Sequence, residues 1–131
     1  MLPHLFLGNV RDVLQLVDTL RTGDVGICFD TGHAYLAGNL YTATPDVARR
    51  LRMIHAHDNR GVRDDHLPPG AGKIAWGVWW RQVASSGFHG PIIIEIAARP
   101  DARAILDDAK RGLRYMNTLI ADHTDLGANG R

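Results

Sequence analysis

The sequence predicts an α/β fold in which helices cover a parallel sheet. Segments with the apolar spacing of helices alternate along the chain with three short, mainly apolar runs at 25–29, 53–57 and 92–96. Nearly continuous apolar runs are typical of parallel strands, and strands separated by helices indicate a parallel sheet. The length of 131 residues suits one compact domain.

The expected elements alternate from a first helix to a last one. Their predicted bounds are a helix over 9–20, a strand over 25–29, a short helix from 44 to about 51, a strand over 53–57, a helix over 76–85, a turn over 87–91, a strand over 92–96 and a long helix from 101 to about 122. The first helix has one apolar face and stops at Gly23. The second begins at Thr44-Pro45, because threonine caps helices and a proline loses no hydrogen bond in the first turn.

Two segments are predicted to lack regular structure. Residues 58–75 are rich in Asp, Gly, Pro and Arg. A loop of that length in a small domain indicates a functional site. Residues 124–131 are expected to form a frayed tail.

Composition narrows the possible partners. The chain has 15 Lys and Arg against 14 Asp and Glu, a net charge of +1. This balance lacks the basic field that would favour nucleic acid or a membrane surface, so a small solute is the expected partner. The single cysteine, Cys28, lies in the first strand and is expected to be buried as a small hydrophobe. A chain without an internal disulfide or a recognisable signal peptide is expected in the cytoplasm.

Each predicted strand ends in a side chain that can bind a metal. Asp30 ends the first strand, His55 and His57 lie on the second, and Glu95 interrupts the isoleucines of the third. The carboxyl ends of parallel strands emerge on one face, so we expect these groups to converge. His57 is the favoured imidazole because it lies nearer the strand end, and His55 is then expected to contact a metal ligand or the substrate.

Simpler interpretations exist for each of these residues. Glu95 could form an ion pair with a lysine or arginine, because a buried carboxylate needs a partner. Asp30 before Thr-Gly could form a turn, and either histidine could be a core residue. In the loop, Asp58 and His66 add further donors, whereas Asp64 and Asp65 are expected to be solvated charges.

Four motifs in order resemble one known superfamily. They are Gly26–Ala34, Ile54–Asn59 with Gly61, Asp65–Gly72 followed by Ile74 and Trp76, and Gly87–Glu95. These residues resemble the xylose isomerase-like TIM barrel superfamily (AP endonuclease family 2), and in particular its sugar phosphate isomerase/epimerase branch. Endonuclease-IV-type repair enzymes share that fold. The resemblance runs from about residue 3 to the closing helix.

The resemblance implies a metal centre in part of a barrel. Asp30, His57 and Glu95 match the family's divalent-metal ligands, and His33 and His66 match positions that line the substrate or hold a further metal. A complete eight-stranded barrel needs roughly 250 residues. Residues 1–131 therefore match the C-terminal portion, with about three of the strands. The family's remaining ligand, a glutamate, precedes the matched part, and open sheet edges are expected to promote self-association.

The implied activity is isomerisation or epimerisation of a keto-sugar or a related hydroxy-carbonyl compound. A Mn, Mg, Co or Zn ion would chelate the substrate, and protons would be transferred at a metal-chelated enediolate. Glu95 and His33 are the expected catalytic residues. The residues expected to line the substrate or to contact the metal ligands are His33, His55, Asp58 and His66. Without the missing glutamate the isolated chain is expected to have weak activity or none.

Two other functions remain open on the sequence. One is an endonuclease-IV-like, metal-dependent phosphodiesterase, which would need several metal ions and a basic grip on DNA. The other is a non-catalytic metal-binding or assembly module.

Overall fold

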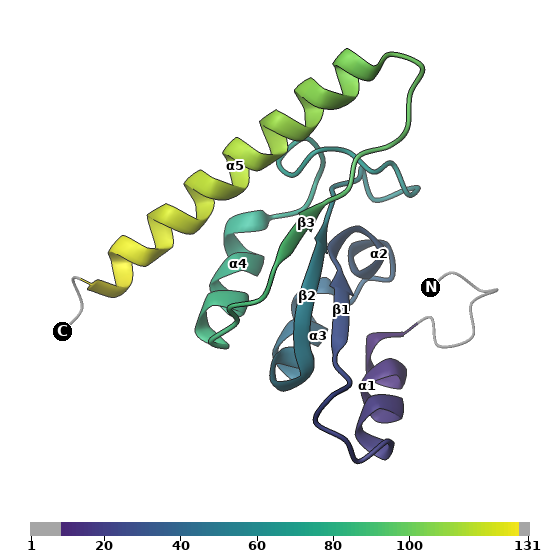
Figure 1. Cartoon of the computed structure of the whole chain (residues 1–131), viewed down its shortest axis with the longest axis vertical. Coiled ribbons are helices and arrows are strands. Elements are labelled where there is room, and N and C mark those ends of the chain that lie inside the picture. The colour runs from purple at the N-terminus through teal and green to yellow at the C-terminus, as the bar shows by residue number, and fades with distance from the viewer. Residues whose placement is uncertain (1–8, 129–131) are drawn as a thin grey trace.

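The computed structural model describes residues 9–128 and has the predicted α/β architecture (Figure 1). The elements are, in order, α1 (Val10–Thr19), β1 (Ile27–Asp30), α2 (Thr31–Leu36), α3 (Leu40–Val47), the 3-10 turn η1 (Ala48–Arg50), β2 (Leu51–Ala56), α4 (Trp76–Ser85), β3 (Ile92–Ile94) and α5 (Ala102–Ala128). Among these helices, none is both long enough and apolar enough to cross a membrane.

The three strands form one open parallel sheet in the order β1-β2-β3. Asp30 of β1 pairs with His55 of β2, and His55 pairs in turn with Ile93 of β3. The carboxyl ends of all three strands therefore lie at the same end of the sheet. The prediction of a partial barrel with about three parallel strands is confirmed, and β1 and β3 are the two edge strands of the sheet in the described residues.

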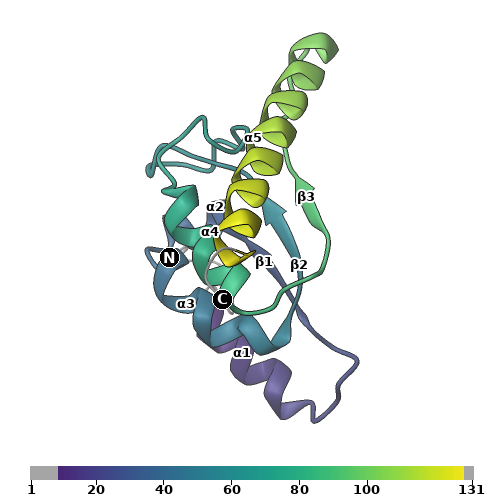
Figure 2. The same ribbon diagram turned by 90° about the vertical axis from the view of Figure 1, so that its left-hand side faces the viewer.

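Helices cover one face of the sheet. In Figure 2, α3 and α4 lie on one side of the strands, where Ile27, Phe29 and Ile54 are buried. The tryptophans of α4 complete this core, because Trp76 and Trp79 are fully buried against it. On the opposite face Ile93 is 44% exposed. Within residues 9–128 no helix covers this face, onto which Asp30 and His55 project.

Cys28 corrects one prediction from the sequence. It lies on the uncovered face of β1 and is exposed, rather than buried as an apolar strand residue. Alternation along the strand explains this, since Ile27 and Phe29 take the covered side. Partial burial raises the pKa of the Cys28 thiol, and the nearby negative charges of Asp30 and Glu95 raise it further.

The segment between β1 and β2 differs from its prediction. A helix not predicted, α2, follows β1 directly, with the Asp30 carboxylate accepting the His33 N–H at 2.8 Å as its cap. The predicted start at Thr44-Pro45 is wrong, because α3 begins at Leu40 and contains Pro45. The Thr44 hydroxyl instead donates to the Leu40 carbonyl at 2.6 Å inside the helix.

The closing helix is longer than predicted. It runs through Ala128 instead of ending near Asp122, and so enters the segment 124–131 that was expected to be frayed. Residues 129–131 lie outside the described part of the chain. The helix α4, by contrast, has the predicted bounds of 76–85.

Candidate metal centre

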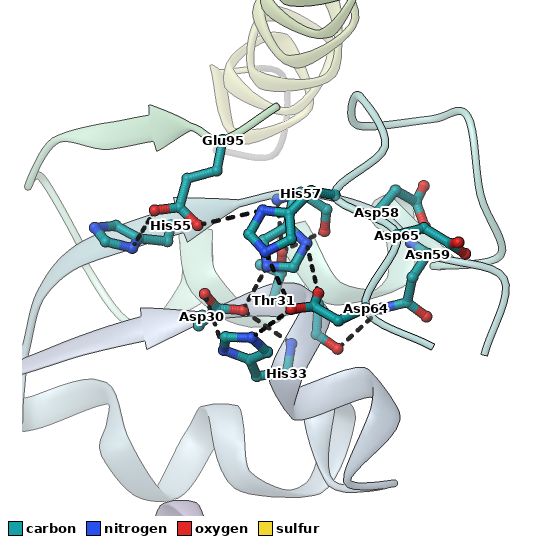
Figure 3. A network of polar contacts seen from close by, with 12 residues as sticks. Asp30, Thr31, His33, His55, His57, Asp58, Asn59, Asp64, Asp65 and Glu95 are labelled. Carbon is teal, nitrogen blue, oxygen red and sulfur yellow. Dashed lines mark hydrogen bonds and ion pairs between the residues drawn. The ribbon is translucent and has the colours of Figure 1, made fainter. Parts of the chain in front are cut away.

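The carboxyl ends of the three strands bring the predicted donors into one polar network (Figure 3). Asp30 is the last residue of β1, His57 follows β2 directly, and Glu95 follows β3. The backbone N–H of Glu95 still donates to the Ala56 carbonyl at 3.2 Å. The end of a strand therefore fixes the backbone position of each of these three residues.

His57 and Asp30 form the centre of this network. His57 is fully buried, and its Nε2 lies 2.9 Å from Oδ1 of Asp30. Thr31 fixes the backbone beside it, since its hydroxyl donates to the His57 carbonyl at 2.8 Å and accepts the His57 N–H at 3.1 Å. Asp30 and Thr31, at the junction of β1 and α2, thus hold the ring and the backbone of His57.

Gly32 makes room for the His57 ring. A Cβ at this position would lie 2.7 Å from Nε2 of His57 and closer still to Cε1 and Nδ1. Real Cβ atoms do not approach other atoms so closely, so any larger residue would displace the ring or the helix α2. This role of Gly32 was not predicted from the sequence.

Glu95 pairs with histidines. Its Oε1 lies 2.8 Å from Nδ1 of His55, and its Oε2 lies 3.8 Å from Nδ1 of His66. The side chains of Glu95 and His55 are each 29% exposed, so both are reachable from solvent. The structure places no lysine or arginine against Glu95 in its described part, where the alternative interpretation had expected one.

Asp64 is the residue that sequence reasoning missed. It was expected to be a solvated charge, but its Oδ2 lies 3.0 Å from Nε2 of His33 and 3.1 Å from Nε2 of His66. Its Oδ1 is 3.7 Å from Nδ1 of His57. The spacing of Asp64 and His66, two residues apart in a loop that follows a donor strand, was the available signal.

The other loop acids have different surroundings. Asp58 is fully buried with four N–H donors around it, so a direct substrate contact is not open to it. Asp65 forms ion pairs with Arg60 and Arg63. The hydrogen bond from Arg63 lowers the pKa of Asp65 below its ordinary value. Neither acid belongs to the donor groups around His57.

The side chains that could bind a metal form two groups, and within each group the ligand atoms lie within 4.8 Å of one another. Asp30, His55 and Glu95 form one group, and His33, His57, Asp64 and His66 form the other. The predicted ligands Asp30, His57 and Glu95 thus fall into two adjacent groups, joined by the contact between Asp30 and His57.

The donor chemistry fits a divalent cation. Imidazole and carboxylate donors suit ions such as Zn, Co and Mn. Nδ1 of His57 is buried and has no hydrogen-bond partner in the described part of the chain. Three carboxylates, from Asp30, Asp64 and Glu95, gather around these histidines. A buried imidazole nitrogen without a hydrogen-bond partner, close to several carboxylates, is a combination of donors that a divalent cation could use.

The Asp30–His57 pair predicts how stability depends on pH. Burial would raise the pKa of Asp30, but the hydrogen bonds from the His57 ring and the His33 N–H, together with the charges of both histidines, outweigh it, and the pKa lies below its ordinary value. Burial would lower the pKa of His57, but Asp30, and then the charges of Asp64 and Glu95, raise it. The Asp30 contribution is therefore lost as pH falls through its folded pKa, and the His57 contribution is lost as pH rises through its folded pKa.

We therefore expect the metal-free chain to be most stable between about pH 4 and pH 6.5, the ordinary values for these two groups. Denaturant unfolding after chelator treatment, at pH 5.5 and at pH 8.5, should give a smaller free energy of unfolding at the higher pH. The variant His57→Gln should lack most of that decline. If the free energy of unfolding of His57→Gln falls equally between the two pH values, other histidines cause the loss of stability.

The chain is similar in sequence to proteins of one known family. The model of the xylose isomerase-like TIM barrel family matches residues 2–119. An uncharacterised protein of Methanocaldococcus jannaschii is 31% identical over 115 residues, covering 86% of this chain and 39% of that protein. A probable endonuclease 4 of Mycobacterium tuberculosis is 28% identical over 102 residues, covering 72% of this chain and 40% of that protein.

Solved structures resemble the chain in the same way. A D-tagatose 3-epimerase-like protein superposes with a TM-score of 0.65 at 29% identity, covering 86% of this chain and 43% of the other. An L-ribulose 3-epimerase superposes with a TM-score of 0.73 at 12% identity, covering 95% and 47%. The chain spans less than half the length of these relatives.

Proposed function

The chain belongs to the xylose isomerase-like TIM barrel family, and from that premise we propose that it carries the metal-binding part of an isomerase or epimerase of keto-sugars or related hydroxy-carbonyl compounds. The observation that carries the proposal is the meeting of imidazole and carboxylate donors at the ends of three parallel strands. The similarity to the epimerase-like structure at 29% identity supports a sugar-like substrate.

We assign the metal to Asp30, His57 and Glu95. His57 is preferred over His55 because it is fully buried and its Nε2 already lies 2.9 Å from Oδ1 of Asp30, with which it would share the ion. A bound divalent ion would act as a Lewis acid on the oxygens of a hydroxy-carbonyl group. The same donors suit Mn, Co and Zn better than Mg, which prefers oxygen ligands.

Glu95 and His33 are the proposed catalytic residues. A carboxylate that is part exposed at the rim of the site can take and return a proton, and His55 orients it through the 2.8 Å contact with Oε1. His33 is 45% exposed and lies between Asp30 and Asp64, at 3.3 Å and 3.0 Å. It is therefore placed to contact a substrate hydroxyl.

A second candidate function has its own observation. His33, Asp64 and His66 gather with His57 into a further group of donors, which a single-metal site does not need. Phosphodiesterases that use several metal ions require such extra donors, and the probable endonuclease 4 is a relative at 28% identity. The net charge of +1 gives weak electrostatic attraction to DNA, so we rank this function second.

One experiment separates these functions. The chain is incubated in D2O with Mn or Co and a panel of ketopentoses and ketohexoses, and deuterium entering the carbon next to the carbonyl is followed by NMR. We expect slow, metal-dependent exchange that falls by roughly 100-fold or more in Glu95→Gln. His89→Ala, an exposed histidine before β3, is the matched control and should exchange like the unmodified chain.

The other outcomes are equally informative. Metal-dependent cleavage of an abasic duplex without deuterium exchange would replace the sugar function by the nuclease function. Bound metal with neither reaction would support a non-catalytic metal-binding module. Because the chain spans less than half of its relatives, a slow rate is compatible with the proposal, but a rate unaffected by Glu95→Gln is not.

Self-association is proposed as the means of covering the open sheet. In the described residues, β1 and β3 each have one edge without a paired strand, and the uncovered face carries the exposed Cys28 and Ile93. Exposed strand edges are templates for pairing with another chain. Sedimentation that stays monomeric at high concentration would argue against it.

A further inference from the structure

The carboxylate of Asp58 lies behind the candidate metal centre and ties together the loop over 58–75. Its side chain is fully buried. Oδ1 accepts the N–H groups of Asn59 at 2.9 Å and Ile74 at 3.1 Å, and Oδ2 accepts Gly70 N–H at 3.1 Å and Trp76 Nε1–H at 2.8 Å. These donors come from the first residues of the loop, from its far end and from the start of α4. One side chain therefore closes the loop on itself.

The backbone around Asp58 strengthens this closure. Its N–H donates to the Leu67 carbonyl at 2.8 Å and its carbonyl accepts the Leu67 N–H at 2.9 Å. Gly72 is necessary for the approach, because a Cβ there would overlap Oδ1 of Asp58. From the outside, the Tyr115 ring of α5 covers Gly70, where an added Cβ would lie 2.8 Å from the ring.

The closed loop carries two of the donors. Asp64 and His66 lie between the two halves that Asp58 joins, and no helix or strand holds them. His66 adopts a positive φ of 45°, a conformation that a free chain seldom populates. Its ring nevertheless stacks on His57 with centroids 3.8 Å apart and planes within 2°. Contacts made by other residues of the loop must therefore hold Asp64 and His66 in place.

We propose that Asp58 is a positioning residue that fixes the loop over 58–75 so that Asp64 and His66 face His57. The proposal rests on the proposed function for the meaning of that arrangement, but its structural part stands without it. Asparagine at this position has one acceptor oxygen, so in either orientation its amide group faces two N–H donors that need an acceptor. The substitution keeps the shape of the side chain and removes the closure.

The test compares Asp58→Asn with Asp108→Asn. Asp108 is another buried aspartate, on α5, where it pairs with Arg99 and Arg111 and belongs to neither donor group. Both variants lose a buried carboxylate, but only one loses the loop closure. Two readouts are taken on each chain: the dissociation constant for cobalt(II) alone, from its absorption spectrum, and the rate of trypsin cleavage after Arg60, Arg63 and Lys73 in the loop.

We expect Asp58→Asn to weaken cobalt binding by about 10- to 100-fold, the range for residues that act on the ligands without touching the metal, because Asp64 and His66 contact the proposed ligands His57 and Glu95. We also expect it to raise loop cleavage at least about tenfold, while Asp108→Asn changes neither by more than about threefold. Unchanged cleavage in Asp58→Asn overturns the proposal. Equal effects in both variants also overturn it, because a general loss of stability would then explain them. If the unmodified chain binds no cobalt, the proposed function fails, and loop cleavage alone still decides the role of Asp58.

Discussion

Replacing His57 by alanine is expected to weaken divalent-metal binding by at least about 100-fold. His57 is fully buried, contacts Asp30 at 2.9 Å and has an unpartnered Nδ1. Loss of a direct ligand should exceed the 10- to 100-fold that is typical of orienting residues. The measurement is a competition titration of cobalt or zinc against a coloured chelator at one buffered pH near 7.5, the same for every variant, because metal binding to imidazole depends on pH.

The control for this experiment is His89→Ala. It removes an exposed imidazole from the turn before β3, at the opposite end of that strand from Glu95, and should leave the affinity within about twofold. Circular dichroism and thermal unfolding show whether His57→Ala is still folded under the titration conditions. A folded His57→Ala chain with unchanged affinity would remove His57 from the ligand set and transfer the metal to Asp30, His55 and Glu95.

The strand ends could be predicted from the sequence because their chemistry is local. A carboxylate inside a run of isoleucines, as at Glu95, conflicts with its surroundings and indicates a partner. Parallel topology then brings Asp30, His57 and Glu95 to one edge, whichever helices lie between them. The fold class followed from the same alternation of helical and apolar segments, and the bounds of α4 were predicted correctly.

The loop and the short helix could not be predicted, for physical reasons. The position of Asp64 depends on the closure around Asp58 and on the covering Tyr115, which are contacts between residues far apart in the chain. The helix α2 has six residues and contains Gly32, so its own propensity is weak. The Asp30 carboxylate caps it, and its glycine leaves the space that the His57 ring occupies.

Replacing Gly32 by alanine is expected to destabilise the chain by about 2 kcal/mol or more, which reverses the usual effect of this substitution. Glycine to alanine inside a helix normally stabilises by about 0.5–1 kcal/mol. Here the added methyl group would overlap the His57 ring, which is fully buried and cannot move away freely. Displacement of the ring should also weaken cobalt binding at least about tenfold. The control Gly23→Ala has open space around its Cβ and should change stability by less than about 0.5 kcal/mol.

A double-mutant cycle shows whether the overlap with His57 is the cause. In the His57→Ala background the space beside Gly32 is empty, so Gly32→Ala should be neutral or stabilising there. The coupling free energy between the two positions should then be about 2–3 kcal/mol, at the upper end of the range for residues in contact. Unfolding by denaturant of the four chains, without metal, gives this value directly. Because the comparison needs no metal and no substrate, it tests the packing of His57 independently of any activity. An equal cost of Gly32→Ala in both backgrounds would mean that the methyl group meets something other than the imidazole, and Gly32 would then not be the residue that makes room for His57.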